Sequence, residues 1–184
     1  MRLSRARLLV VPAVLGIALL TGCGGSDAPS TTSDSTTAAS TSDSAKAMDP
    51  CESISAEEVG AILGGTTTSA KGPSGQCEYS QEDARALAAS ISAATDVDGA
   101  GGIEGAKSGT TAVMDGDAED VPGIGDAAFV VVGKVAGGSS DQAQGVVAVK
   151  GQLVTVYVSQ ASGLPAAKVH DTAVALLTLA AAKA

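Results

Sequence analysis

The chain has 184 residues, of which 20 are acidic and 11 are basic, so its formal net charge at pH 7 is -9. This length accommodates one domain. The acidic balance argues against nucleic acid as a partner, because phosphate binding requires clustered Lys and Arg. One His, three Cys, two Tyr, one Phe and no Trp leave few side chains for nucleophilic, acid–base or stacking chemistry. We therefore expect a protein without enzyme activity, cofactor or metal ion.

The N-terminus has the pattern of a bacterial export signal. A basic start is followed by an apolar run, residues 8–20, which is shorter than the roughly 20 residues of a membrane-spanning helix. The run ends in Leu20-Thr21-Gly22-Cys23, which resembles a lipobox, the site where a signal peptidase cuts before a lipidated Cys. The pattern predicts a signal peptide over residues 1–22 and a lipid anchor on Cys23. The alternative is an ordinary signal peptide in which Cys23 falls by chance.

A disordered, Ser/Thr-rich tether is expected over residues 23–48. Between residues 24 and 47 there are 12 Ser or Thr and no Val, Ile, Leu or aromatic residue, so this segment cannot bury a core. The two or three acyl chains expected on Cys23 would hold the protein stably in the cell membrane. These features predict a protein anchored on the outer face of the membrane, in the cell envelope, with its domain held clear of the headgroups.

The predicted domain, residues 49–184, begins with a helix. The sequence Ser55-Ala56-Glu57-Glu58 matches a capping box, and apolar residues at helical spacing follow it up to Gly64-Gly65. Three strands are predicted next, at residues 66–68, 76–80 and 87–94. We expect the last two to pair with each other across a polar turn.

The middle of the domain, residues 95–114, loses any clear periodicity. Its glycines lie close to Lys107 and are similar to a nucleotide-binding loop, but Ala106 stands where that motif requires Gly. No predicted strand leads into these glycines either. We therefore expect a flexible loop rather than a phosphate site.

The C-terminal half is predicted to hold three strands and a closing helix. A turn rich in Pro and Gly precedes a strand over 127–135 and a loop over 137–144. Residues 145–150 and 153–159 predict a hairpin joined at Gly151-Gln152. The closing helix opens at Pro165 and carries one apolar stripe: Val169, Ala173, Leu176, Leu177 and Ala180. Together these elements predict an α+β domain, an antiparallel sheet packed by an N-terminal and a C-terminal helix.

Two cysteines remain if Cys23 carries lipid. Cys51 and Cys77 form an even pair in an exported chain, which is typical of a structural disulfide. Closing the loop between them would stabilise the fold by about 3 to 4 kcal/mol on the chain-entropy account. The alternative is a metal-binding or redox-active pair, but their spacing is not CxxC and the chain has one His.

Several short motifs follow one another along the domain: Asp49-Pro50-Cys51, Leu63-Gly64-Gly65, Cys77-Glu78-Tyr79 and the run from Val121 to Ala128. With the hairpin and the closing helix, they resemble small actinobacterial lipoproteins, some of them mycobacterial, that form a family of unknown function. Tyr79 stands where such proteins often carry Trp, and the Gly-rich middle is a poorer match to the helix usual in them. The resemblance implies an envelope location and a disulfide, and it implies no activity.

The single His gives little basis for catalysis. His170 lies beside Asp171 on the predicted closing helix, where adjacent side chains point apart. No Gly-x-Ser-x-Gly sequence presents a nucleophile. We therefore expect a solvent-facing histidine.

The densest acidic segment also matches a calcium loop in part. Four of its acids have the spacing of calcium ligands: Asp115, Asp117, Glu119 and Asp126. Asp120, however, occupies the position at which that loop needs Gly for a sharp bend. The segment is therefore expected to be a solvated acidic loop without metal.

Two function classes follow from these features. The first is an interaction module that binds another envelope protein or a cell-wall component. The second is a carrier or sensor of an apolar small molecule held between sheet and helices, which would need a closed apolar cavity. For the interaction module we expect a working surface at the acidic segment and the following turn, although a plain structural turn is the alternative. That surface comprises Asp115, Asp117, Glu119, Asp120, Gly123, Ile124, Gly125 and Asp126.

Overall fold

The computed structural model describes residues 46–95, 101–135, 137–161 and 163–184. The predicted signal peptide, Cys23 and most of the predicted tether lie outside the described residues. None of the helices in the described part is long and apolar enough to cross a membrane.

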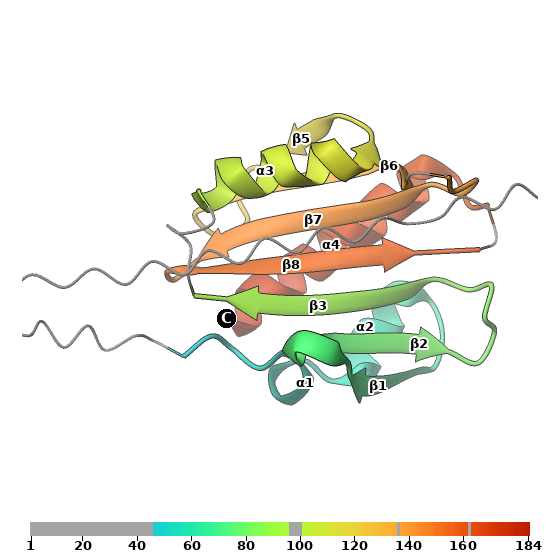
Figure 1. The fold of residues 1–184 in the computed structure, drawn as a ribbon. Helices are drawn as coiled ribbons and strands as arrows, with labels where there is room; N and C mark the ends of the chain where they lie inside the picture. The colour runs from blue at the N-terminus through green and yellow to red at the C-terminus, as the bar shows by residue number, and fades with distance from the viewer. Residues whose placement is uncertain (1–45, 96–100, 136, 162) are drawn as a thin grey trace, which may run out of the picture. The chain divides into compact units, whose positions relative to one another are not determined.

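The described chain forms one antiparallel sheet with helices on both faces (Figure 1). Eight strands take part, in the order β1-β2-β3-β8-β7-β6-β4, with β5 also paired to β6. The strands are β1 (Thr67–Lys71), β2 (Cys77–Gln81), β3 (Ala88–Ala94), β4 (Met114–Asp115), β5 (Ala118–Asp120), β6 (Ala127–Val135), β7 (Gln142–Val149) and β8 (Gln152–Ser159). The helices are α1 (Pro50–Ser53), α2 (Ala56–Leu63), α3 (Gly102–Val113) and α4 (Ala166–Lys183), with a 3-10 turn η1 (Pro73–Gly75). The predicted α+β class with an antiparallel sheet is confirmed.

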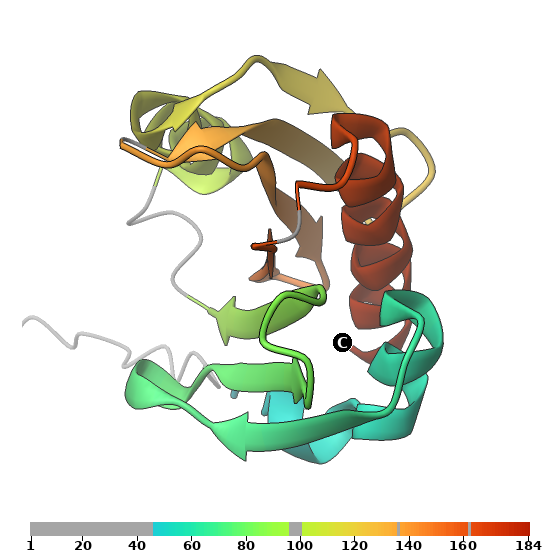
Figure 2. The ribbon, with the colours of Figure 1, turned by 90° about the vertical axis from the view of Figure 1, so that its right-hand side faces the viewer.

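Helices α2 and α4 lie on one side of the sheet, and α3 lies on the other (Figure 2). The apolar stripe predicted for the closing helix is fully buried against β6, β7 and β8. Val154, Val156 and Val158 of β8 alternate along the strand and all face this helix. The main core of the domain therefore lies between the sheet and α4.

The segment predicted to be a flexible loop is a helix from Gly102 to Val113, so that prediction was wrong. The helix packs one face on β6 and β7, with Thr110 buried and Ile103 and Ala106 partly buried on it. Its glycines lower helix propensity, and packing on the sheet overrides this weak local preference. Phe129 anchors the second core beneath it, together with Met114, Val131, Val146 and Leu153.

The start and the end predicted for the first helix of the domain are confirmed. Ser55 and Glu58 form the expected capping box, and Gly64 ends α2 in the left-handed conformation with φ 87°. The short helix α1 was not predicted. Its N-cap is Asp49, whose carboxylate accepts a hydrogen bond from the amide of Cys51.

The hairpin between β7 and β8 differs from the prediction at its turn and its start. The two central turn residues are Lys150 and Gly151, with φ of 49° and 75°, while Gln152 already pairs with Val149. Two successive positive φ values match the twist of the flanking strands. Strand β7 also begins at Gln142, inside the predicted loop, because it continues the ladder along β6.

Candidate functional site

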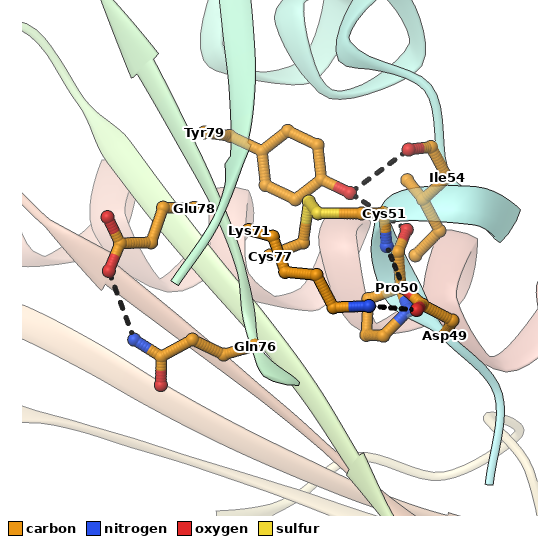
Figure 3. The surroundings of a disulfide bond; sticks show 9 residues. All are labelled: Asp49, Pro50, Cys51, Ile54, Lys71, Gln76, Cys77, Glu78 and Tyr79. Atoms are coloured by element: carbon orange, nitrogen blue, oxygen red, sulfur yellow. Dashed lines mark hydrogen bonds and ion pairs between the residues drawn. A yellow bond between two sulfur atoms is a disulfide. The ribbon is translucent and has the colours of Figure 1, made fainter. Parts of the chain in front are cut away.

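The disulfide between Cys51 and Cys77 is confirmed, and it joins α1 to β2 (Figure 3). The two Cα atoms are 5.1 Å apart, within the normal range for such bonds. Cys77 is fully buried. A disulfide whose Cys77 half is fully buried and which ties a helix to a strand acts as a structural crosslink.

Tyr79 and Asp49 complete this corner of the domain. The Tyr79 hydroxyl lies 3.1 Å from the carbonyl oxygen of Pro50 and 3.0 Å from that of Ile54, the two acceptors for its proton (Figure 3). Burial raises the pKa of Tyr79 to about 12. Lys71 lies 2.6 Å from Asp49 and lowers the pKa of that carboxyl. These polar groups satisfy one another, so they stabilise this corner of the fold.

The acidic segment is not one loop, because residues 118–120 form strand β5. Neighbouring residues of a strand point to opposite faces. Glu119 therefore faces α4 and contacts His170, whereas Asp120 faces α3 and pairs with Lys107. Asp115 lies in β4, in register with Lys134 of β6. The predicted interaction surface is thus divided between two faces of the sheet.

The turn after β5 lines a hollow on the α3 side, with a volume of about 290 Å³. Asp120, Pro122, Gly123 and Asp126 line it together with Lys107 and Glu104. Ile124 belongs to the main core and is 9% exposed, so it is not the surface residue that the sequence predicted.

Gly125 has a packing role in the same turn. Its φ is 58°, and a Cβ at this position would lie 2.5 Å from the carbonyl oxygen of Ala148. Glycine is required because the turn packs directly on β7. Gly123 has φ 84° with open space around it, so its glycine suits the backbone conformation of the turn rather than a close contact.

On the opposite side, a second hollow of about 400 Å³ lies between β5, β6 and the first turns of α4. We call it the β5–α4 groove. Its lining consists of Asp117, Glu119, Val130, Val132, Ala166, Ala167, His170 and Asp171. Two of the predicted surface acids, Asp117 and Glu119, meet here with the single histidine of the chain.

His170 lies between two carboxylates in this groove. Its Nε2 is 3.6 Å from an Oε of Glu119, and its Nδ1 is 3.3 Å from an Oδ of Asp171. The side chain is 26% exposed. His170 is thus half-buried, and the expectation that it points away from Asp171 was wrong, because its Nδ1 lies beside that carboxylate.

Apart from His170, the residues that line the groove are apolar or acidic, and no Ser, Thr, Cys or Lys is among them. In the described ranges, no three His, Cys, Asp or Glu side chains are arranged to hold a metal ion. The groove combines an apolar floor with an acidic rim, and such a site suits a positively charged group on an aliphatic stem.

A local signal for this arrangement was present in the sequence. Acids at Asp117 and Glu119 alternate with Ala118, which is the two-residue period of a strand rather than the pattern of a loop. The contact between β5 and His170 has no such signal, because it joins positions about fifty residues apart.

The chain matches no family model, and no curated protein or solved structure is significantly similar to it. The resemblance to small actinobacterial lipoproteins therefore stays a prediction. Function is inferred from the groove, the disulfide and the N-terminal pattern.

Proposed function

We propose that this protein is a lipoprotein of the cell envelope, anchored through Cys23 on the outer face of the membrane, whose domain binds another envelope protein without catalysis. The lipobox and the short apolar run support the anchor. The disulfide between Cys51 and Cys77 supports export, because such bonds form and persist in oxidising compartments. The predicted N-terminal signal and disordered tether belong to the same proposal.

The packing of the core favours an interaction module over a carrier. Val156 of β8 and Leu176 and Leu177 of α4 have no exposed surface. A closed chamber wide enough for a water molecule would leave accessible surface on the side chains lining it. A Cβ added at Gly145 would lie 2.6 Å from Leu177, so sheet and helix are in direct contact. An apolar ligand would have to displace this core.

The β5–α4 groove is the observation that carries the binding function. It opens at the surface of a filled domain, and charged side chains from β5 and α4 converge on it. Shape and charge together favour recognition of a partner, whereas an isolated acidic strand would be an ordinary solvated surface.

The test is a pull-down from native envelope extract with the mature protein. Wild-type protein should capture a reproducible set of proteins, and the double variant Asp117→Asn/Glu119→Gln should lose them. The Asp120→Asn variant, on the opposite face of β5, is the matched control and should behave as wild type. Capture should weaken as salt rises, because the groove is charged.

Two outcomes would contradict the proposal. Capture of nothing by the wild-type protein would remove the binding function. An apolar small molecule that copurifies with the protein at one equivalent, detected by mass spectrometry, would establish the carrier instead.

A further inference from the structure

We propose that β1 forms the interface of a homodimer, in which two copies of this chain pair their β1 strands antiparallel about a two-fold axis at Ser69. This interface is separate from the β5–α4 groove, and it goes beyond the binding function proposed above. Three features of the structure support it: unpaired main-chain groups on β1, a hollow beside the strand, and opposite charges on the strand and in the hollow.

Strand β1 ends the described sheet without a neighbour on its outer side (Figure 1). Residues 68–71 are exposed, and Lys71 is the only charged residue of the strand. The opposite edge is protected, because β4 and β5 have only two and three residues and carry Asp115, Glu119 and Asp120. Very short strands and charged side chains prevent pairing between sheet edges. Over residues 67–70, β1 has no charge that would prevent it.

The main-chain groups on the outer side of β1 match a second copy of the same strand. The amide of Gly72 donates to the carbonyl oxygen of Gln76, so residue 72 faces the β2 side. Successive residues direct their N–H and C=O groups alternately to the two sides of a strand. Thr67, Ser69 and Lys71 therefore direct theirs away from β2. Antiparallel pairing centred on Ser69 sets Ser69 opposite Ser69 and Thr67 opposite Lys71, so all three residues are paired in both copies.

A hollow of about 510 Å³ lies beside the start of β1. Glu57, Gly60 and Ala61 of α2 line it together with Thr67. Directly opposed residues of two paired strands carry their side chains on the same face of the sheet. The Lys71 side chain of the second copy, opposite Thr67, would therefore lie over this hollow, which has room for its aliphatic stem.

The charges of the strand and of the hollow are complementary. Glu57 is the one charged residue among those that line the hollow. Lys71 lies 2.6 Å from Asp49 of its own copy, yet its side chain is 60% exposed, and an ammonium group has three N–H donors. Lys71 can therefore bind Glu57 of the second copy and keep its bond with Asp49. The two-fold axis forms this contact twice, once on each side of Ser69.

The experiment is disulfide crosslinking of the protein in its own envelope. Ser69→Cys should give a dimer on a non-reducing gel after mild oxidation, because directly opposed Cα atoms in such a pair lie within disulfide range. Ser80→Cys is the matched control. Ser80 is exposed on β2, one strand away from the edge, so this variant should stay monomeric.

A charge exchange in the Ser69→Cys background tests the register of the two strands. Lys71→Glu should lower the dimer fraction about tenfold, because a carboxylate then meets Glu57 of the other copy. Adding Glu57→Lys should restore the dimer. This second change cannot restore the lost contact between residue 71 and Asp49, so recovery reports on the contact between copies rather than on the fold of one copy.

Three results would overturn the inference. The first is a dimer fraction in Ser69→Cys no higher than in Ser80→Cys. The second is a crosslink from Ser69→Cys to a different protein, which would make β1 a docking strand for a foreign segment. The third is a dimer that Lys71→Glu leaves unchanged, or whose loss Glu57→Lys does not reverse. Each of these results leaves the binding function proposed for the β5–α4 groove unaffected.

Discussion

At the scale of single residues, Tyr79 is a buried polar side chain that hydrogen-bonds to the backbone near the disulfide. Its hydroxyl serves the carbonyl groups of Pro50 and Ile54 at the end that carries the disulfide. Tyr79→Phe should lower the free energy of unfolding by about 1 to 2 kcal/mol, because a buried hydrogen bond from the hydroxyl is lost, although the Pro50 carbonyl keeps the amide of Ile54 as a donor. Tyr157→Phe is the matched control, since no hydrogen bond of its hydroxyl is found among the described residues. Urea titration measures both, and equal losses would contradict this role.

The pKa of Tyr79 also predicts a loss of stability in alkali. Burial raises the pKa from 10.0 to about 12 in the folded protein. A group whose pKa is raised in the folded state stabilises the protein fully at pH values below its unfolded-state pKa. The contribution of Tyr79 to the free energy of unfolding is therefore lost as pH rises from 10 through 12. The urea midpoint should therefore fall over this range, and Tyr79→Phe should reduce the fall.

Glu58 predicts a loss of stability in acid. Its carboxylate lies 2.6 Å from Lys183 and also caps α2, and the pKa is lowered from 4.5 to about 2, chiefly by the hydrogen bond with Lys183. A carboxyl group whose pKa is lowered in the folded state stabilises the protein at pH values above its unfolded-state pKa. The contribution of Glu58 to the free energy of unfolding is therefore lost as pH falls from 4.5 toward 2. Glu58→Gln should flatten the decrease of the urea midpoint over this range. Glu57→Gln, which removes an exposed neighbour, should leave the decrease as steep as in wild type.

At the scale of elements, two glycines have opposite roles. Gly109 lies within α3 with open space around it, whereas a Cβ at Gly116 would collide with the carbonyl oxygen of Val132. Gly109→Ala should raise stability by about 0.5 to 1 kcal/mol through helix propensity. Gly116→Ala should lower it by about 1 to 3 kcal/mol, because the strand leading to Asp117 must move away from β6. Thermal unfolding compares the two, and stabilisation by Gly116→Ala would show that the close approach of β4 and β6 is wrongly described.

Helices and strands with a clear periodic spacing of apolar residues could be predicted from the sequence. Elements that depend on tertiary contacts could not. The stripe from Val169 to Ala180 determines which face of α4 is buried, and it lies where the pattern predicts. Helix α3 lacks such a signal because glycines dilute its apolar face. The sequence analysis treated the β5–α4 groove as two separate features, an acidic loop and an isolated histidine, since no local pattern indicates that Glu119 lies beside His170.

At the scale of the whole molecule, the disulfide fixes α1, and with it the start of the domain, to the sheet. Cys51 and Cys77 are 26 positions apart, and a loop of this length stabilises by about 3 to 4 kcal/mol. The double variant Cys51→Ser/Cys77→Ser should lose free energy of unfolding on this scale in urea titration. An unchanged urea midpoint in that variant would contradict a structural role for the bond.

The anchor is the feature on which the proposed location depends. Mass spectrometry of the mature protein from its own envelope tests it most directly. We predict a chain that begins at Cys23 and carries two or three acyl groups, and a Cys23→Ser variant that stays uncut at this position and unacylated. A wild-type chain that begins at another residue, or that has a free thiol at Cys23, would contradict the lipid anchor.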